Sequence, residues 1–112
     1  MQIRFFNSLP NTVENFEPVE SGTVRMYSCG PTVWEYSHIG NFRCFLFYDV
    51  LKRYLQYRGF EVEHVMNLPD VDDRIVQKVT DGGTTLDAYV QTYIDGFHDD
   101  IDALGIVPAD RY

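Results

Sequence analysis

A strand, a break and a long helix follow one another between residues 24 and 59, and few folds accommodate this order. Residues 24–29 alternate apolar and polar side chains, as a half-buried strand does. Gly30 and Pro31 break that pattern, and from Gly40 to Gly59 apolar residues recur at helical spacing. A loop between a strand and a helix is where α/β proteins bind phosphate groups. The first helical amides there lack partners within the helix, and the helix dipole is positive at that end.

A second strand is predicted at Glu61–Met66, directly after the helix. The order strand, helix, strand is a βαβ unit, whose two strands are parallel. We therefore predict an α/β fold, a Rossmann-like parallel sheet with flanking helices. Cys29 and Asn67 then stand at the C-terminal ends of the two strands, which is the edge at which open α/β sheets bind ligands.

The remaining elements are predicted from turn and capping residues. Strands are expected at residues 3–6 and 13–18, a short helix after Asp73, and a helix from Leu86 to Gly105. Residues 108–112 are predicted to start a connection. The core face of the first helix is predicted at Phe42, Phe45, Leu46, Val50, Leu51, Tyr54 and Leu55, widened by Phe47 and Tyr48.

Charge limits the partners of this chain. At 112 residues it is one domain at most, and its net charge is −8. An acidic domain is a poor main surface for nucleic acid, because affinity for phosphate backbone comes largely from Lys and Arg. Arg43, Lys52, Arg53 and Arg58 do cluster in one segment, which is either a solvated helix face or a patch that contacts nucleic acid.

No apolar run is long enough to span a membrane, and no signal-peptide pattern opens the sequence. The two cysteines, Cys29 and Cys44, do not form a disulfide framework. Reduced thiols and the missing signal favour a cytoplasmic protein without membrane contact.

Three motifs, at residues 29–33, 38–41 and 67–73, resemble those of class I aminoacyl-tRNA synthetases, and of cysteinyl-tRNA synthetases in particular. Residues 38–41 read His-Ile-Gly-Asn and resemble the HIGH signature, with Asn in the last place. Cys-Gly-Pro-Thr-Val lies upstream at 29–33, and Asn-Leu-Pro-Asp-Val-Asp-Asp follows at 67–73. The resemblance covers essentially the whole chain. It implies that residues 1–112 are the N-terminal portion of the catalytic domain, incomplete by themselves and forming the first half of its HUP-type nucleotide-binding fold.

The resemblance implies a cysteine-tRNA ligase that activates cysteine with ATP and Mg²⁺ and transfers it to tRNA(Cys). The cysteine carboxylate would attack the α-phosphate, so catalysis would consist of positioning and charge stabilisation. His38 and Asn41 match the catalytic residues, and Gly30 and Gly40 join them in ATP binding. The family's second phosphate-binding loop, the KMSKS motif, is absent from this sequence.

Substrate cysteine is implied to bind at Cys29, Thr32 and Asn67. The cysteine matching Cys29 is a zinc ligand in the family, and that Zn²⁺ takes the substrate thiolate, which it prefers to a hydroxyl. Without the resemblance, the favoured interpretation of Cys29 is a small buried side chain, because free cysteines are among the most buried residues. The family's other ligands, a Cys, a His and a Glu, lie beyond this chain, so the zinc site is expected to be incomplete here. His64 and His98 match no ligand and are predicted to be ordinary surface or half-buried histidines.

Structural roles compete with these assignments. His38 between a turn and a helix is often a capping residue, and Thr32 is a common turn residue. Asp70, Asp72 and Asp73 form either the start of a helix or a cation site, and the helix start is the favoured interpretation.

Two departures from the family pattern leave other functions open. Pro69 replaces a threonine, which removes an amide proton and a hydroxyl, and Cys44 also stands where threonine is common. A truncated, non-catalytic paralogue that binds nucleotide or a partner protein is one alternative. A ligase that joins cysteine to an amino-sugar, as in mycothiol synthesis, is another.

We predict that the 112-residue chain does not retain stoichiometric zinc, because catalytic zinc sites use about three protein ligands and only Cys29 matches one. Metal analysis after dialysis measures this directly. Near one zinc per chain, lost on Cys29→Ser, would mean that further ligands lie within this chain.

Overall fold

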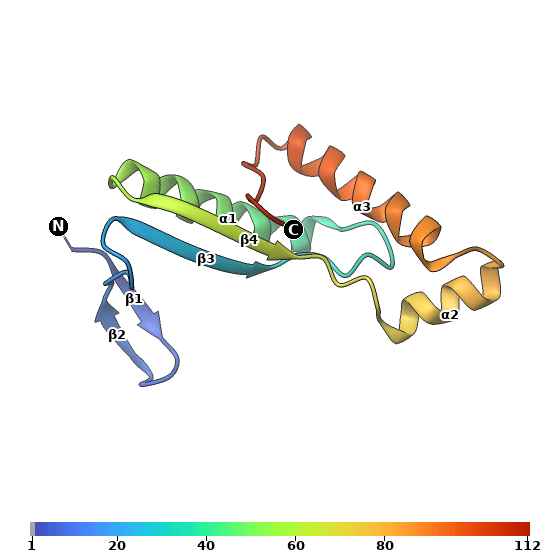
Figure 1. Cartoon of the computed structure of the whole chain (residues 1–112), viewed down its shortest axis with the longest axis horizontal. Helices are drawn as coiled ribbons and strands as arrows, with labels where there is room; N and C mark the ends of the chain where they lie inside the picture. Colours follow the sequence, from blue (N-terminus) through green and yellow to red (C-terminus); the bar gives the residue numbers. More distant parts are fainter. Residues whose placement is uncertain (1) are drawn as a thin grey trace.

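The computed structural model describes residues 2–112 as an elongated molecule with a small parallel sheet at its centre (Figure 1). Its radius of gyration is 16.9 Å, against about 13 Å for a compact domain of this length. No described helix combines the length and apolar content that a membrane span requires. The elements are β1 (Arg4–Asn7), β2 (Thr12–Asn15), β3 (Thr23–Cys29), α1 (Ile39–Tyr57), β4 (Glu61–Asn67), α2 (Asp73–Gly82) and α3 (Leu86–Ala103).

Strands β3 and β4 pair in parallel over their whole length, with Thr23 opposite Glu61 and Cys29 opposite Asn67. Helix α1 connects them, which confirms the predicted βαβ unit. The described residues thus contain a parallel strand pair and three helices, and the complete Rossmann-like sheet stays a prediction.

The C-terminal residues lie against the sheet. Arg111 forms a parallel bridge with Val65 of β4, and the Met66 N–H donates to the Arg111 carbonyl at 3.0 Å. Because β3 occupies the other edge of β4, this segment lies where a third parallel strand would. The sequence predicted only a connection here, since a few residues carry no usable periodicity.

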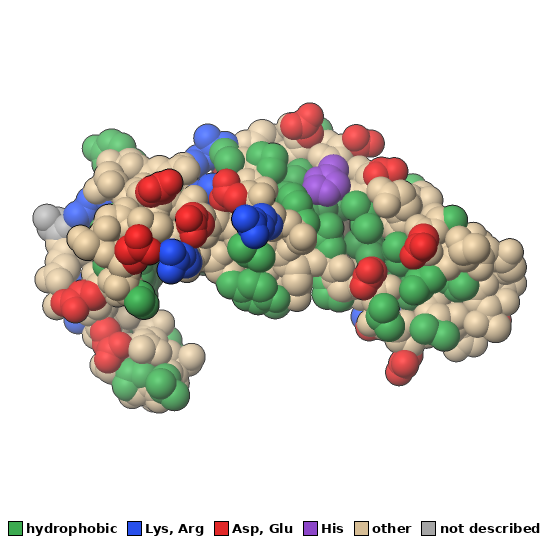
Figure 2. Space-filling view, in the orientation of Figure 1, with side chains coloured by type: hydrophobic (Ala, Val, Ile, Leu, Met, Phe, Trp, Pro, Cys, Tyr) green, Lys and Arg blue, Asp and Glu red, His purple; other side chains and the backbone are tan. Residues whose placement is uncertain are grey.

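Strands β1 and β2 form a separate antiparallel hairpin. Edge-to-face aromatic contacts join it to the body, from Phe5 to Phe16 at 5.2 Å and from Phe16 to Phe60 at 6.0 Å between ring centroids. Its tip points away from the sheet and carries apolar side chains, among them Leu9, which is 93% exposed (Figure 2). Both strands occur near their predicted places.

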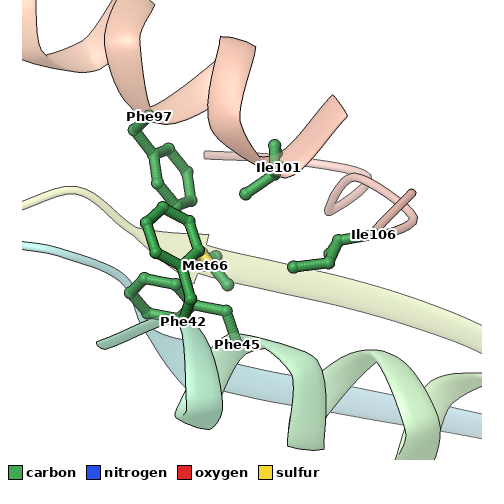
Figure 3. Close-up of a cluster of buried hydrophobic side chains, with 6 residues drawn as sticks. All are labelled: Phe42, Phe45, Met66, Phe97, Ile101 and Ile106. Atoms are coloured by element: carbon green, nitrogen blue, oxygen red, sulfur yellow. The ribbon is translucent and has the colours of Figure 1, made fainter. Parts of the chain in front are cut away.

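The main apolar cluster lies over the C-terminal half of β4. Figure 3 shows Phe42 and Phe45 of α1 meeting Phe97 and Ile101 of α3 around Met66. The Phe45 and Phe97 rings are 5.4 Å apart between centroids in an edge-to-face arrangement. Burial of aromatic side chains contributes strongly to stability, so this cluster fixes α3 across α1.

The buried face of α1 is rotated from the predicted one. Leu46, Val50 and Tyr54, predicted to face the core, are exposed, and Val50 is 63% accessible. Phe47 is exposed to the same extent, so it does not widen the core face. The prediction was wrong because it sought an apolar stripe, whereas two positions of the true stripe are charged. The buried positions are Phe42, Phe45, Asp49, Lys52 and Leu55.

Asp49 is stable in its buried position because each of its carboxylate oxygens accepts a hydrogen bond. Oδ1 accepts the Val107 N–H at 2.9 Å, and Oδ2 accepts Arg53 Nε at 2.8 Å. Arg53 Nη2 also donates to the Gly105 carbonyl at 2.7 Å. A buried carboxylate without such partners would be very costly, so these contacts tie the C-terminal segment to α1.

Lys52 is 3% exposed, and its ammonium group donates to the Pro108 carbonyl at 3.1 Å and to Asp110 at 3.2 Å. The two interpretations of the basic segment both assumed exposed cations, and both are wrong for Lys52. Arg53 is likewise engaged with Asp49. The four cations therefore do not form one exposed patch.

His64 is buried, contrary to the prediction, with 3% of its surface exposed. It stands on the inner face of β4, where Nε2 lies 2.7 Å from the Ser28 hydroxyl. Burial lowers the pKa of His64, the nearby Lys52 lowers it further, and Asp110 opposes the shift. His98 is half-buried as predicted, edge-on to the Tyr112 ring.

We predict that the free energy of unfolding falls as pH is lowered from about 7 to about 5. The pKa of His64 is lower in the folded chain, so the unfolded chain binds the proton first and gains stability on acidification. The pKa of Asp110 is also lowered, but its contribution is lost only below about pH 4. Urea unfolding at several pH values measures the slope, and His64→Gln should flatten it. Equal slopes in the two proteins would contradict the assignment.

Candidate active site

Strands β3 and β4 end in a close backbone contact at Gly30. The Gly30 N–H donates to the Asn67 carbonyl at 3.0 Å and to Asn67 Oδ1 at 2.9 Å. A Cβ at position 30 would collide with that carbonyl and would meet Met66 Cγ at 3.0 Å. Gly30 is thus required by the contact between strand ends, and it directs the chain into the loop of residues 30–38.

This loop is held by α2 and α3. Val33 is 1% exposed and packs with Ile75 of α2 and Val90 of α3. The Tyr89 hydroxyl donates to the Trp34 carbonyl at 2.8 Å. Two helices that follow more than thirty residues later in the sequence therefore fix the loop that leads to the HIGH-like motif.

His38 is the N-cap of α1, and a reciprocal capping arrangement surrounds it. Its Nδ1 accepts the Gly40 N–H at 3.0 Å, and its own N–H donates to Asn41 Oδ1 at 3.0 Å. The Asn41 N–H is bonded to the His38 carbonyl. Two amides predicted to be open to phosphate are therefore occupied. Because Nδ1 accepts, the neutral ring carries its proton on Nε2, which remains a donor. A Cβ on Gly40 would lie 2.8 Å from the ring, so the cap requires glycine there.

A shallow pocket of about 280 Å³ lies beside this cap. Among the predicted site residues, Thr32, His38 and Asn41 line it, whereas Cys29 and Asn67 do not. The pocket thus brings Thr32 of the motif at 29–33 next to His38 and Asn41 of the motif at 38–41. Cys29 and Asn67, at the ends of β3 and β4, lie outside it. The lining residues are Pro31, Thr32, Trp34, Glu35, Tyr36, Ser37, His38, Asn41 and Arg74.

Arg74 is the one Lys or Arg among these lining residues. Its guanidinium lies over the Trp34 ring, 4.8 Å from the centroid. Nε and Nη2 donate to the Asp72 carboxylate at 2.7 and 3.0 Å, and Asp72 caps α2 by accepting the Arg74 N–H at 3.0 Å. These bonds lower the pKa of Asp72 to about 2 and raise the pKa of Arg74. The acidic run is therefore a helix start, as favoured from the sequence.

Cys29 stands at the C-terminal end of β3 and is exposed, so its interpretation as a buried side chain is wrong. No group of three or more His, Cys, Asp or Glu side chains that could hold a metal occurs among residues 2–112. Cys29 is thus a single candidate ligand, and the described residues do not build a zinc site by themselves.

Cys44 is also exposed, and its thiol donates to the Tyr48 hydroxyl at 3.0 Å. This hydrogen bond is the main reason that the pKa of Tyr48 is raised to about 12. Desolvation and the negative charges of the Cys44 and Cys29 thiolates also raise the pKa of Tyr48. The sequence placed the two cysteines without any link between them.

Comparison with known families accounts for these motifs. The model of the tRNA synthetases class I (C) catalytic domain matches residues 15–112. The chain belongs to this family. The resemblance stated from the sequence is thereby confirmed over most of the chain.

Several cysteine-tRNA ligases are relatives of this chain. It is 46% identical over 112 residues to that of Halalkalibacterium halodurans, which covers all of the chain and 24% of the relative. It is 45% identical over 106 residues to that of Koribacter versatilis, covering 95% of the chain and 21% of the relative. It is 44% identical over 110 residues to the ligase of Symbiobacterium thermophilum, covering 98% of the chain and 23% of the relative. The chain therefore spans less than a quarter of the length of these relatives.

Motif reasoning missed several residues that line this pocket, among them Trp34 and Arg74. The motifs assign neither residue a role in substrate binding. A weak signal was present, since Arg74 follows an acidic capping run and Trp34 is an aromatic residue in a polar loop. Only the packing of α2 against the loop brings the two side chains together.

We predict that Gly30→Ala lowers the free energy of unfolding by about 1–3 kcal/mol, because the new methyl group must displace the β4 backbone. Gly82→Ala is the matched control, since a Cβ there meets no atom within 4 Å. Its effect should stay within about 1 kcal/mol. Urea denaturation measures both. Equal stability of Gly30→Ala and the unchanged chain would show that the strand ends are not in tight contact.

Proposed function

We propose that this chain forms the ATP- and cysteine-binding part of a cysteine-tRNA ligase, as the N-terminal portion of a Rossmann-like catalytic domain. The pocket beside the α1 cap carries the proposal, because it brings Thr32, His38 and Asn41 of two family motifs together. The family match and the cysteine-tRNA ligases among the relatives support the same activity.

In the proposed reaction the carboxylate of cysteine attacks the α-phosphorus of ATP. The bond from the α-phosphorus to its bridging oxygen breaks, pyrophosphate leaves with the electron pair, and cysteinyl-adenylate remains for transfer to tRNA(Cys). Mg²⁺ bound to ATP neutralises part of the phosphate charge. This chain's contribution is to hold the phosphates while charge moves onto the leaving group.

His38 and Asn41 are the donors assigned to these phosphates. The capping bonds occupy His38 Nδ1 and Asn41 Oδ1, which turns the remaining Nε2–H and Nδ2–H₂ groups into the available donors. Both side chains are held by the same cap, so their donors are preorganised. Gly40 serves the site by admitting the His38 ring. Gly30 serves it by setting the path of the loop.

Cysteine recognition is assigned to Cys29, Thr32 and Asn67. Cys29 supplies one thiolate toward a zinc ion, and zinc would favour a substrate thiol over a hydroxyl. The further ligands of that zinc ion would come from outside the described residues. Asn67 is engaged with the Gly30 amide, which makes it a residue that positions the loop as well as one near the substrate.

Pro69 favours a second candidate function, nucleotide binding without cysteine activation. Its carbonyl accepts the Val33 N–H at 3.2 Å, while the amide and hydroxyl of the family's threonine are missing. Loss of these two donors would weaken the binding of substrate cysteine. It would leave the phosphate donors at the α1 cap in place.

A chimeric enzyme tests the proposal. The segment of the Halalkalibacterium halodurans ligase that aligns with this chain at 46% identity is replaced by residues 1–112. We expect cysteine-dependent exchange of pyrophosphate into ATP. His38→Ala should lower kcat/KM about 100-fold, the usual cost of one transition-state donor. His98→Ala, a histidine away from the pocket, is the matched control.

The isolated chain should give background exchange, because the KMSKS loop is absent from it. A folded chimera without exchange would contradict the ligase proposal. Restoration of exchange by Pro69→Thr would then assign the loss to the proline and support the non-catalytic candidate.

A further inference from the structure

The pocket beside the α1 cap needs positive charge if it is to bind a triphosphate, as the proposed function requires. The chain carries a net charge of −8, and Glu35 is an acid that lines this pocket. Two amides of the first helical turn, those of Gly40 and Asn41, already bond to His38 and are not free for phosphate. A cationic side chain must therefore supply the main attraction for phosphate.

Arg74 is positioned to supply it. A guanidinium has five N–H donors, and Asp72 engages one on Nε and one on Nη2. Within residues 2–112, no hydrogen bond is formed by Nη1, and no ion pair joins Arg74 to Glu35. Three donors thus remain for a ligand in the pocket that this residue lines.

The surroundings of Arg74 also fix its orientation. One face of the guanidinium covers the Trp34 ring, and the bidentate bond to Asp72 holds its plane. Trp34 is itself fixed through its carbonyl by Tyr89. A cation held in this way loses little side-chain entropy when it binds an anion.

We propose that Arg74 binds the triphosphate group of the nucleotide, together with His38 and Asn41, from its place against Trp34. This inference rests on the proposed function. The ligand chemistry is a polyphosphate anion, carried by ATP or by free inorganic polyphosphate. The alternative role of the same contacts is a structural clamp that fastens the loop of residues 30–38 to α2.

Binding to the 112-residue chain separates these roles. Trp34 is the single tryptophan, so its fluorescence reports ligands in this pocket. Mg-ATP, inorganic tripolyphosphate and adenosine are titrated into the unchanged chain and into Arg74→Gln, Arg74→Lys and Asp72→Asn. Asparagine is as good a helix cap as aspartate, so Asp72→Asn weakens the clamp and keeps both α2 and the arginine.

Arg74→Gln should weaken Mg-ATP and tripolyphosphate about tenfold or more and leave adenosine unchanged. The affinity of Arg74→Lys for both anions should lie between those of the unchanged chain and Arg74→Gln. Asp72→Asn should bind the anions at least as tightly as the unchanged chain. Unchanged Mg-ATP affinity in Arg74→Gln would overturn the assignment and spare the proposed function. Equal losses in Arg74→Gln and Asp72→Asn would overturn it in favour of the clamp. No Mg-ATP binding by the unchanged chain would overturn the proposed function and this inference together.

Discussion

The contact between Gly30 and Asn67 is the constraint on which the site depends. Two parallel strands end there with one amide bonded to both oxygens of a single asparagine, and a side chain at position 30 would separate them. From this point the chain after β3 enters the loop toward His38, and the chain after β4 turns toward Asp72. Because both paths start from one fixed contact, the cap of α1 and Arg74 in the first turn of α2 reach the same pocket.

The loop before α1 has little structure of its own and is ordered by later parts of the chain. Val33 fills a gap between α2 and α3, and Tyr36 lies edge-on to Tyr93 with its ring against Gly96. These contacts replace the regular hydrogen bonds that a loop lacks. The helices α2 and α3 thus support the loop that leads to His38.

The basic side chains differ in position, some lying in ion pairs within the fold and one beside the pocket. Lys52 and Arg53 neutralise carboxylates that fasten the C-terminal segment, and acidic side chains are more widespread than basic ones on the face shown in Figure 2. An acidic exterior does not attract phosphate, so an anion site needs a local cation. Among the residues that line the pocket, Arg74 is the one Lys or Arg, and its contacts with Asp72 and Trp34 hold it there.

The sequence by itself determined the order of elements, the parallel strand pair and the family, because periodicity, caps and motifs are local patterns. It predicted His38, Asn41 and Thr32 as site residues. It predicted the wrong core face for α1 and a surface or half-buried position for His64, which is buried. Those errors share one cause, since a buried polar group is stable only with partners distant in the chain, which local patterns do not reveal. The tertiary structure alone decided which ends of β3, β4 and α2 meet, and hence that Arg74 joins the pocket while Cys29 lies outside it.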